Sequence, residues 1–200
     1  MQVENHKEEV PFAHYCEKFQ AADPNEMALR SGAKWDGAAF TLTLLGTQYS
    51  ITHPEYSISP AVESLPLQTF LLRFLLEGKK GSYSAEFKTF REMPWGELYI
   101  QPFTGRVLTR AAFTFGTRLE SFRKGAEALG GLPLKHADAA YEFELIEQYR
   151  LRLLVWEGDE EFPPNAQLLY TENFVSGFSA EDRVVAGDLL IGAIKTAMQK

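Results

Sequence analysis

The stretch that decides the fold spans residues 140–156 and reads AYEFELIEQYRLRLLVW. From 140 to 146 apolar residues alternate with glutamates, and from 150 to 156 leucine and valine alternate with arginines. An alternation with period two is typical of strands that bury one face. Since about three residues separate the two segments, we expect an antiparallel hairpin with apolar side chains turned inward and Glu144 near Arg152.

The chain on either side of this hairpin predicts further strands and helices. Residues 167–170 predict a third strand, and Ser179 is the expected N-cap of a final, largely buried helix. Upstream, apolar residues spaced by three and four over residues 109–129 predict one amphipathic helix. Residues 64–78 predict another helix, with its apolar side chains on one side.

The N-terminal part predicts two short helices within residues 1–34, with Pro11 at the first position of the first helix and Asp23 capping the second. Two strands follow near 40–44 and 49–51, joined by a tight turn at Gly46-Thr47 with glycine at its first central position. Helices and hairpins come in clusters and do not alternate as βαβ units. The predicted class is therefore α+β, a single domain with a mixed or mostly antiparallel sheet packed by helices.

The domain organisation that we expect is an N-terminal helical segment, 1–34, that forms one compact unit with an α+β core domain, 35–200. The chain contains no repeat and no linker rich in glycine, serine or proline. A chain of 200 residues, of which 45% are hydrophobic, is large enough to bury one well-packed core.

Charge and cysteine content exclude several classes of function. The formal net charge of −7 argues against a nucleic-acid partner, because phosphate binding depends on dense lysine and arginine. The single cysteine, Cys16, can form no internal disulfide and no iron-sulfur cluster, and at its helical position we expect an inert thiol. The polar, acidic N-terminus and the lack of an apolar run of about 20 residues predict a cytoplasmic protein without a membrane partner. The oligomeric state stays open.

The densest group of polar side chains is the acidic turn, residues 156–164, which reads WEGDEEFPP. Alternate residues of an extended chain point to the same side, so Asp159 and Glu161 are the candidate metal ligands, and Trp156 is the apolar wall of the same cleft. The alternative is a solvated turn in which Trp156 and Phe162 plug the core.

Other candidates carry weaker signals. Arg73 interrupts an apolar helix and Arg91 precedes the Met-Pro-Trp-Gly turn that contains Trp95, and a guanidinium near so much apolar surface is expected to find a carboxylate. His53 and His136 each have an acid two residues away, a pattern that suits either a general base or a satisfied surface histidine.

The run LLVWEGDEEFPP at 153–164, followed by AQLLY at 166–170 and a closing helix, resembles the C-terminal signature of the bacterial and archaeal family named domain of unknown function 3786. The stretches 71–76 and 87–96, and Gly130-Gly131 with Asp138, are similar to the rest of the family's pattern. The resemblance covers roughly residues 35–195 and is most specific at the tryptophan-acid-proline run. It implies a role in anaerobes, where some relatives carry an iron-sulfur module or lie near corrinoid-dependent methyl-transfer genes.

Three functions follow as hypotheses. The preferred one is a noncatalytic ligand-binding or accessory protein of anaerobic one-carbon or redox metabolism, with a small molecule or a protein as its partner. The second is a carboxylate-dependent, metal-assisted enzyme that uses the acidic turn, and the third is a protein-interaction module. Which cofactor is bound, if any, is left open. The candidate ligand-binding residues are Trp156, Asp159, Glu161, Arg73, Arg91 and Trp95.

Overall fold

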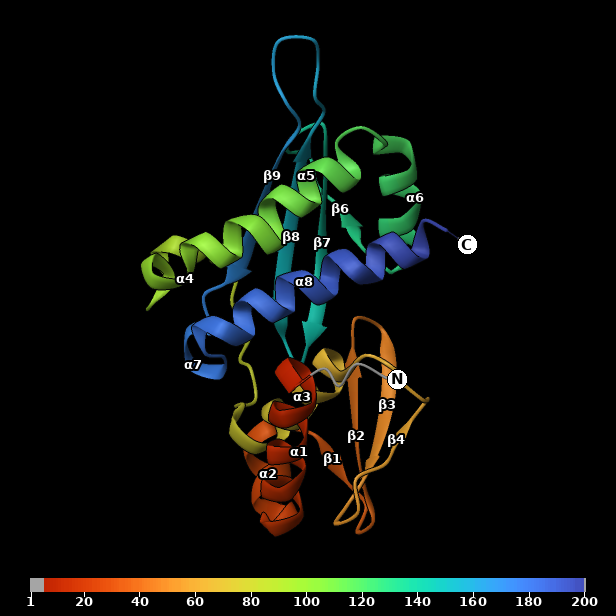
Figure 1. Cartoon of the computed structure of the whole chain (residues 1–200), viewed down its shortest axis with the longest axis vertical. Coiled ribbons are helices and arrows are strands. Elements are labelled where there is room, and N and C mark those ends of the chain that lie inside the picture. The colour runs from red at the N-terminus through yellow and green to blue at the C-terminus, as the bar shows by residue number, and fades with distance from the viewer. Residues whose placement is uncertain (1–5, 200) are drawn as a thin grey trace.

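The computed structural model describes residues 6–199, and the hairpin identified above lies at the centre of its larger sheet (Figure 1). Strands β7 (Ala139–Ile146) and β8 (Tyr149–Trp156) pair antiparallel, and β9 (Asn165–Thr171) pairs with the other edge of β8. Side chains along β8 alternate between buried and half-buried positions. The predicted hairpin and the third strand are confirmed.

The register of the hairpin differs from the expected one. Glu144 lies opposite Arg150 and is exposed, whereas Glu142 lies opposite Arg152. Glu142 is the acid that accepts hydrogen bonds from both arginines, at 3.2 Å from Arg150 and 2.8 Å from Arg152. The reason is the turn, because residues 147–148 alone form it, both with positive φ, and β7 shifts register just before its end.

Both sheets are antiparallel throughout. The larger one has the strand order β5-β9-β8-β7-β6, with β5 (Phe87–Thr89) and β6 (Leu132–Pro133) at its edges. The smaller one has the order β1-β2-β3-β4, formed by Lys34–Trp35, Ala39–Leu44, Thr47–Thr52 and Ile58–Ser59. This is the single-domain α+β arrangement that the sequence predicts.

The turn between β2 and β3 is shifted by one residue from the expected position. Leu44 pairs with Thr47, so the central residues are Leu45 and Gly46, with φ of 47° and 77°. Leucine is unusual at positive φ. Here a tertiary contact fixes it: the Leu45 side chain is buried, and its N–H donates to the carbonyl of Leu145 in β7 at 2.8 Å.

Helices α1 (His6–Ala21), α2 (Pro24–Ser31) and α3 (Leu65–Glu77) pack with the smaller sheet in what we call the N-terminal lobe, residues 6–77 (Figure 1). Asp23 caps α2 as predicted, since its side chain accepts from the N–H of Asn25 at 2.7 Å. Pro11 is not the first residue of its helix, because α1 already begins at His6.

The C-terminal lobe, residues 87–199, places helices across one face of the larger sheet (Figure 1). The prediction of a single helix over residues 109–129 is wrong, because α5 ends at Phe115 and α6 begins at Leu119. Gly116 ends α5 and packs against the loop before β9, where a Cβ would lie 2.5 Å from Cβ of Pro164, and the chain turns before α6 begins. The elements are η1 (Phe90–Glu92), α4 (Gly96–Phe103), the π-helical η2 (Thr104–Thr109), α5 (Arg110–Phe115), α6 (Leu119–Ala128) and α7 (Phe174–Gly177).

The final helix, α8 (Ala180–Ala197), begins as predicted at Ser179. The hydroxyl of Ser179 accepts from the N–H of Asp182 at 3.1 Å, and the Asp182 carboxylate accepts in return from the N–H of Ser179 at 3.3 Å. Within residues 6–199, neither α8 nor another helix combines the length and the apolar character needed to cross a lipid bilayer.

Candidate functional site

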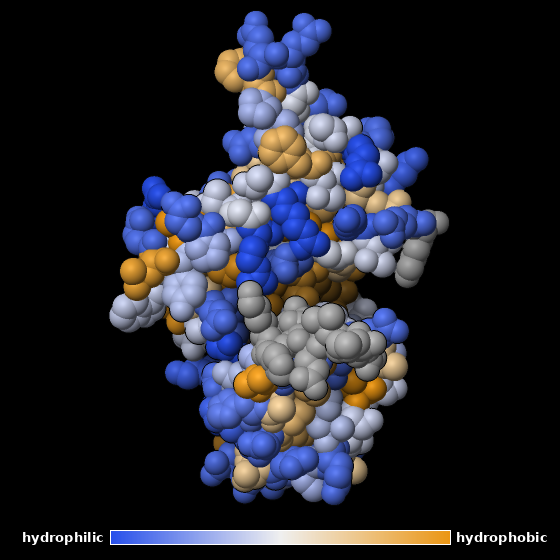
Figure 2. Space-filling model, in the orientation of Figure 1, coloured by the Kyte–Doolittle hydropathy of each residue, from blue (hydrophilic) through white to orange (hydrophobic). Residues whose placement is uncertain are grey.

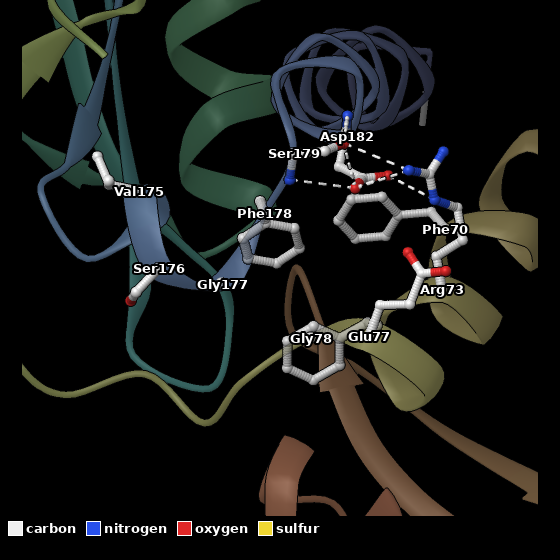
Figure 3. A pocket seen from close by; sticks show the side chains of 11 residues that line it. Phe70, Arg73, Glu77, Gly78, Val175, Ser176, Gly177, Phe178, Ser179 and Asp182 are labelled. Carbon is white, nitrogen blue, oxygen red and sulfur yellow. Dashed lines mark hydrogen bonds and ion pairs between the residues drawn. The ribbon is translucent and has the colours of Figure 1, made fainter. Parts of the chain in front are cut away.

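A cleft of about 280 Å³ lies where the two lobes meet, and we call it the interlobe cleft (Figure 3). Its walls come from α3 on one side and from the α7–α8 segment on the other. These two segments are about one hundred residues apart in the sequence, so the cleft exists only in the assembled fold. The side chains used below are Phe70, Arg73, Phe74 and Glu77 from α3, and Val175, Phe178, Ser179 and Asp182 from the other wall.

Arg73 and Asp182 form an ion pair across the cleft. Nε of Arg73 lies 3.0 Å from Oδ1 of Asp182, and Nη2 donates to Oδ2 at 3.1 Å. The two side chains are only 16% and 10% exposed. Arg73 also donates to the hydroxyl of Ser179 at 3.3 Å, and its guanidinium lies 5.3 Å from the centre of the Tyr15 ring. The expected carboxylate partner of Arg73 is thereby found.

Electrostatics in the cleft follow from this burial. Burial raises the pKa of the Asp182 carboxyl, against the opposing effects of Arg73 and Ser179. For Arg73, burial acts to lower the pKa of the guanidinium, but the nearby acids, led by Asp182, hold it above its usual value. The two groups therefore depend on each other, because either charge alone would be poorly solvated.

Aromatic rings form the apolar part of the cleft. The Phe178 ring stacks on Phe70 and on Phe74, with 5.5 Å between ring centres in both pairs. The Tyr149 ring packs edge-on against Phe178 at 4.7 Å, which ties the cleft to the larger sheet. No sequence pattern singles out Phe178, because it belongs to no periodic run. Arg73 is the one predicted site residue that the cleft contains.

The acidic turn joins β8 to β9 and projects from the end of the larger sheet (Figure 1). The Asp159 carboxylate closes the turn on itself, since Oδ1 accepts from the N–H groups of Glu161 at 2.8 Å and Phe162 at 2.7 Å. Among residues 6–199, no three His, Cys, Asp or Glu side chains come close enough to hold a metal ion. The four acids of the turn are exposed, as a solvated turn requires, but Phe162 is 67% exposed, so the expectation that it plugs the core is wrong.

Trp156 and Phe162 instead border a shallow cavity of about 460 Å³ together with the two prolines. Arg91 and Trp95 lie elsewhere, beyond β5, which pairs with the far end of β9 from the acidic turn. Arg91 has an acidic neighbour, Glu97 at 3.3 Å, but both side chains are exposed. The six predicted ligand-binding residues thus fall at three separate places.

Among the side chains that the structure describes, neither candidate histidine has a side-chain hydrogen-bond partner. His53 is part of the N-terminal lobe's packing: Nε2 hydrogen-bonds the Phe19 carbonyl at 3.0 Å, and its ring is edge-on to Phe19 and Trp35. His136 is exposed in the loop before β7, and the nearby Asp138 carboxylate accepts from the N–H of Glu157 at 2.8 Å.

Burial raises the pKa of the Cys16 thiol, which keeps it protonated and weakly nucleophilic.

Replacing Asp159 with alanine is expected to lower the free energy of unfolding by about 0.5–2 kcal/mol, because two N–H groups of the turn lose their acceptor. Glu161→Ala is the matched control and should change stability little, since its exposed side chain closes no turn. Urea unfolding measures both. If millimolar Mn²⁺ or Ca²⁺ raised the melting temperature of the native chain but not of the Asp159 variant, the structural role given to Asp159 would be insufficient.

Comparison with known proteins identifies the family. The family model described as "Domain of unknown function (DUF3786)" matches residues 23–193, a range that contains the interlobe cleft and the acidic turn. No curated protein and no solved structure matches the chain. Because the matched range takes up far more than half of the 200 residues, the chain belongs to the DUF3786 family.

Proposed function

We propose that this chain is a noncatalytic ligand-binding or accessory protein, and that its ligand binds in the interlobe cleft. The observation that carries the proposal is the buried Arg73–Asp182 pair set beside stacked phenylalanine rings. A concave site in which a small number of convergent polar groups orient the ligand is a common form of small-molecule site. The cleft, at about 280 Å³, is slightly smaller than the usual small-molecule pocket of about 300–1,000 Å³, which favours a compact ligand.

Charge in the cleft favours a ligand with a positive group. Asp182 and Glu181 both lie within ion-pair distance of Arg73, at 3.0 and 3.4 Å. Glu77 is the second carboxylate of the cleft wall beside Asp182, and no cation lies within ion-pair distance of it among the side chains that the structure describes, residues 9–199. In Figure 3 the Glu77 side chain extends beside Arg73 with no dashed line joining them. A compact ammonium compound would meet this carboxylate at the cleft wall.

A binding role has more support than a catalytic one. The polar groups of the cleft serve the structure: Ser179 and Asp182 cap α8, and Arg73 neutralises Asp182. A setting in anaerobic one-carbon or redox metabolism, in the cytoplasm and without nucleic acid, completes the proposal and is supported by the sequence resemblance and the acidic charge. The metal-assisted enzyme has less support because Asp159 is occupied by its own turn.

The test is a variant that fills the cleft. Val175→Trp adds an indole at a half-exposed wall position, and Val10→Trp makes the same change on α1 at a position outside the cleft. Native and variant proteins, purified anaerobically and exposed to a metabolite extract of anaerobically grown cells, are compared by native mass spectrometry. We expect a retained small molecule in the native chain and in the Val10 variant, and its loss in the Val175 variant. Equal retention in all three would refute the cleft as the site.

A further inference from the structure

The acidic turn carries a shallow apolar groove, far from the residues that line the interlobe cleft. The groove has a volume of about 460 Å³, and we call its six lining residues the Phe162 groove: Trp156, Glu157, Phe162, Pro163, Pro164 and Asn165. Figure 2 shows hydrophobic residues among hydrophilic ones at the tip that projects from the larger sheet in Figure 1. Four adjoining apolar residues at one exposed place indicate a contact surface, whereas isolated ones do not.

The shape of the Phe162 groove is fixed by the chain itself. The N–H of Asp159 donates to the Phe162 carbonyl at 2.9 Å, and the Asp159 carboxylate accepts from the N–H of Phe162 at 2.7 Å. Gly158 lies against Pro164, where a Cβ would be 2.6 Å from Cδ of the proline ring. Pro163 and Pro164 have φ fixed by their rings. A surface that is ordered in advance loses little conformational entropy when a partner binds.

The charge of the acidic turn indicates the chemistry of the partner. Four exposed acids follow one another closely on the turn with no base among them: Glu157, Asp159, Glu160 and Glu161. Among the side chains that the structure describes, residues 9–199, none of the four forms an ion pair. Their negative charge is therefore not neutralised within the chain and attracts a base from outside it.

Neighbouring charges reduce this excess of acid without cancelling it. A second hollow, of about 420 Å³, adjoins the groove at Glu157 and is lined by side chains from residues 117–123. On another side, the loop 134–138 contacts the turn through Asp138, which accepts from the N–H of Glu157. Residues 117–124 and 134–138 contain two acids and four bases: Glu120, Asp138, Arg118, Arg123, Lys124 and Lys135. With the four acids of the turn the count is six acids against four bases, a net charge of −2 with the histidine neutral.

We propose that the Phe162 groove binds a basic segment of a partner protein, whose apolar side chain packs on Phe162 and Trp156 while its lysines or arginines meet the acids of the turn. Grooves lined by aromatic side chains commonly take extended peptide segments, and the hollow that adjoins this one at Glu157 lengthens the surface in a way that suits such a segment. A second copy of this chain is a poor occupant, because in a two-fold contact each copy would present the same acids to the other.

A library of random short peptides displayed on phage tests the proposal with a defined probe. The immobilised native chain selects binders, and counter-selection on Phe162→Ser removes the peptides that bind elsewhere; this substitution leaves the backbone bonds of the turn in place. We expect the remaining peptides to be rich in lysine and arginine and to contain a large apolar residue. Leu29→Ser, at an exposed position on α2, is the matched control and should retain the same peptides. Selected peptides without an excess of bases, or no peptides that depend on Phe162, would refute the proposal.

Fluorescence anisotropy of one selected peptide, made synthetically, then tests the role of charge. Glu160→Lys/Glu161→Lys reverses two charges beside the groove, so the affinity should fall by about tenfold or more and should depend less on salt than that of the native chain. Glu55→Lys/Glu63→Lys makes the same change of net charge at exposed positions in the N-terminal lobe and should bind as the native chain does. Circular dichroism confirms that each variant folds. Equal affinity of the two double variants would overturn the proposal, and so would self-association through Phe162 in place of peptide binding.

Discussion

Replacing Arg73 with methionine is expected to lower the free energy of unfolding by about 3–5 kcal/mol at neutral pH, because Asp182 stays buried without a counter-charge. The methionine covers the apolar surface that the arginine stem covers, so the loss reports the charge. The double variant Arg73→Met/Asp182→Asn removes both charges and should recover most of the stability. Urea unfolding of the native, single and double variants measures these differences.

The same variant should show a defined pH dependence. Burial already raises the pKa of Asp182, and loss of Arg73 removes an effect that opposes this rise. A carboxyl whose pKa is higher in the folded than in the unfolded state favours folding when protonated, so the deficit relative to the native chain should be small near pH 4 and grow as the pH rises. A deficit that is equal at pH 4 and pH 7 would show that the guanidinium acts through packing alone.

Truncating Phe178 to alanine should cost about 3–5 kcal/mol, because the ring is buried and stacks on Phe70 and Phe74 where the lobes meet. Phe113→Ala is the matched control, since the same truncation at an exposed position on α5 removes little buried surface. Thermal and urea unfolding compare the two. If both variants lost the same stability, the aromatic contacts in the cleft would have no special role.

Local patterns predict the elements of this fold well because each rests on short-range physics. The alternation in β7 and β8 reflects one buried face, and Asp23, Ser64 and Ser179 cap helices through hydrogen bonds to residues two or three positions away. What local patterns miss is register. A turn of two residues instead of three, together with the register shift before the end of β7, places Arg152 opposite Glu142 instead of Glu144, and no composition rule fixes either feature.

The candidate site is harder to predict for a different reason. Arg73 stands out because a charge interrupts an apolar helix, which signals that a partner exists without saying which one. Its partner is 109 positions away, and only the assembled lobes bring the two together. At the acidic turn the sequence predicts a metal site that the structure does not assemble. The acids are close in sequence but project into solvent from one loop, and the Asp159 carboxylate accepts hydrogen bonds from N–H groups of the same loop.

The contact at Leu45 bears on how the molecule folds. The left-handed conformation of this leucine is unfavourable by itself and is stabilised by burial and by the bond to the Leu145 carbonyl in the other lobe. The tip of the β2–β3 hairpin is therefore complete only when the larger sheet is already in place. Residues 6–77 therefore lack one contact that completes their own hairpin, and we expect the two lobes to unfold in one cooperative transition.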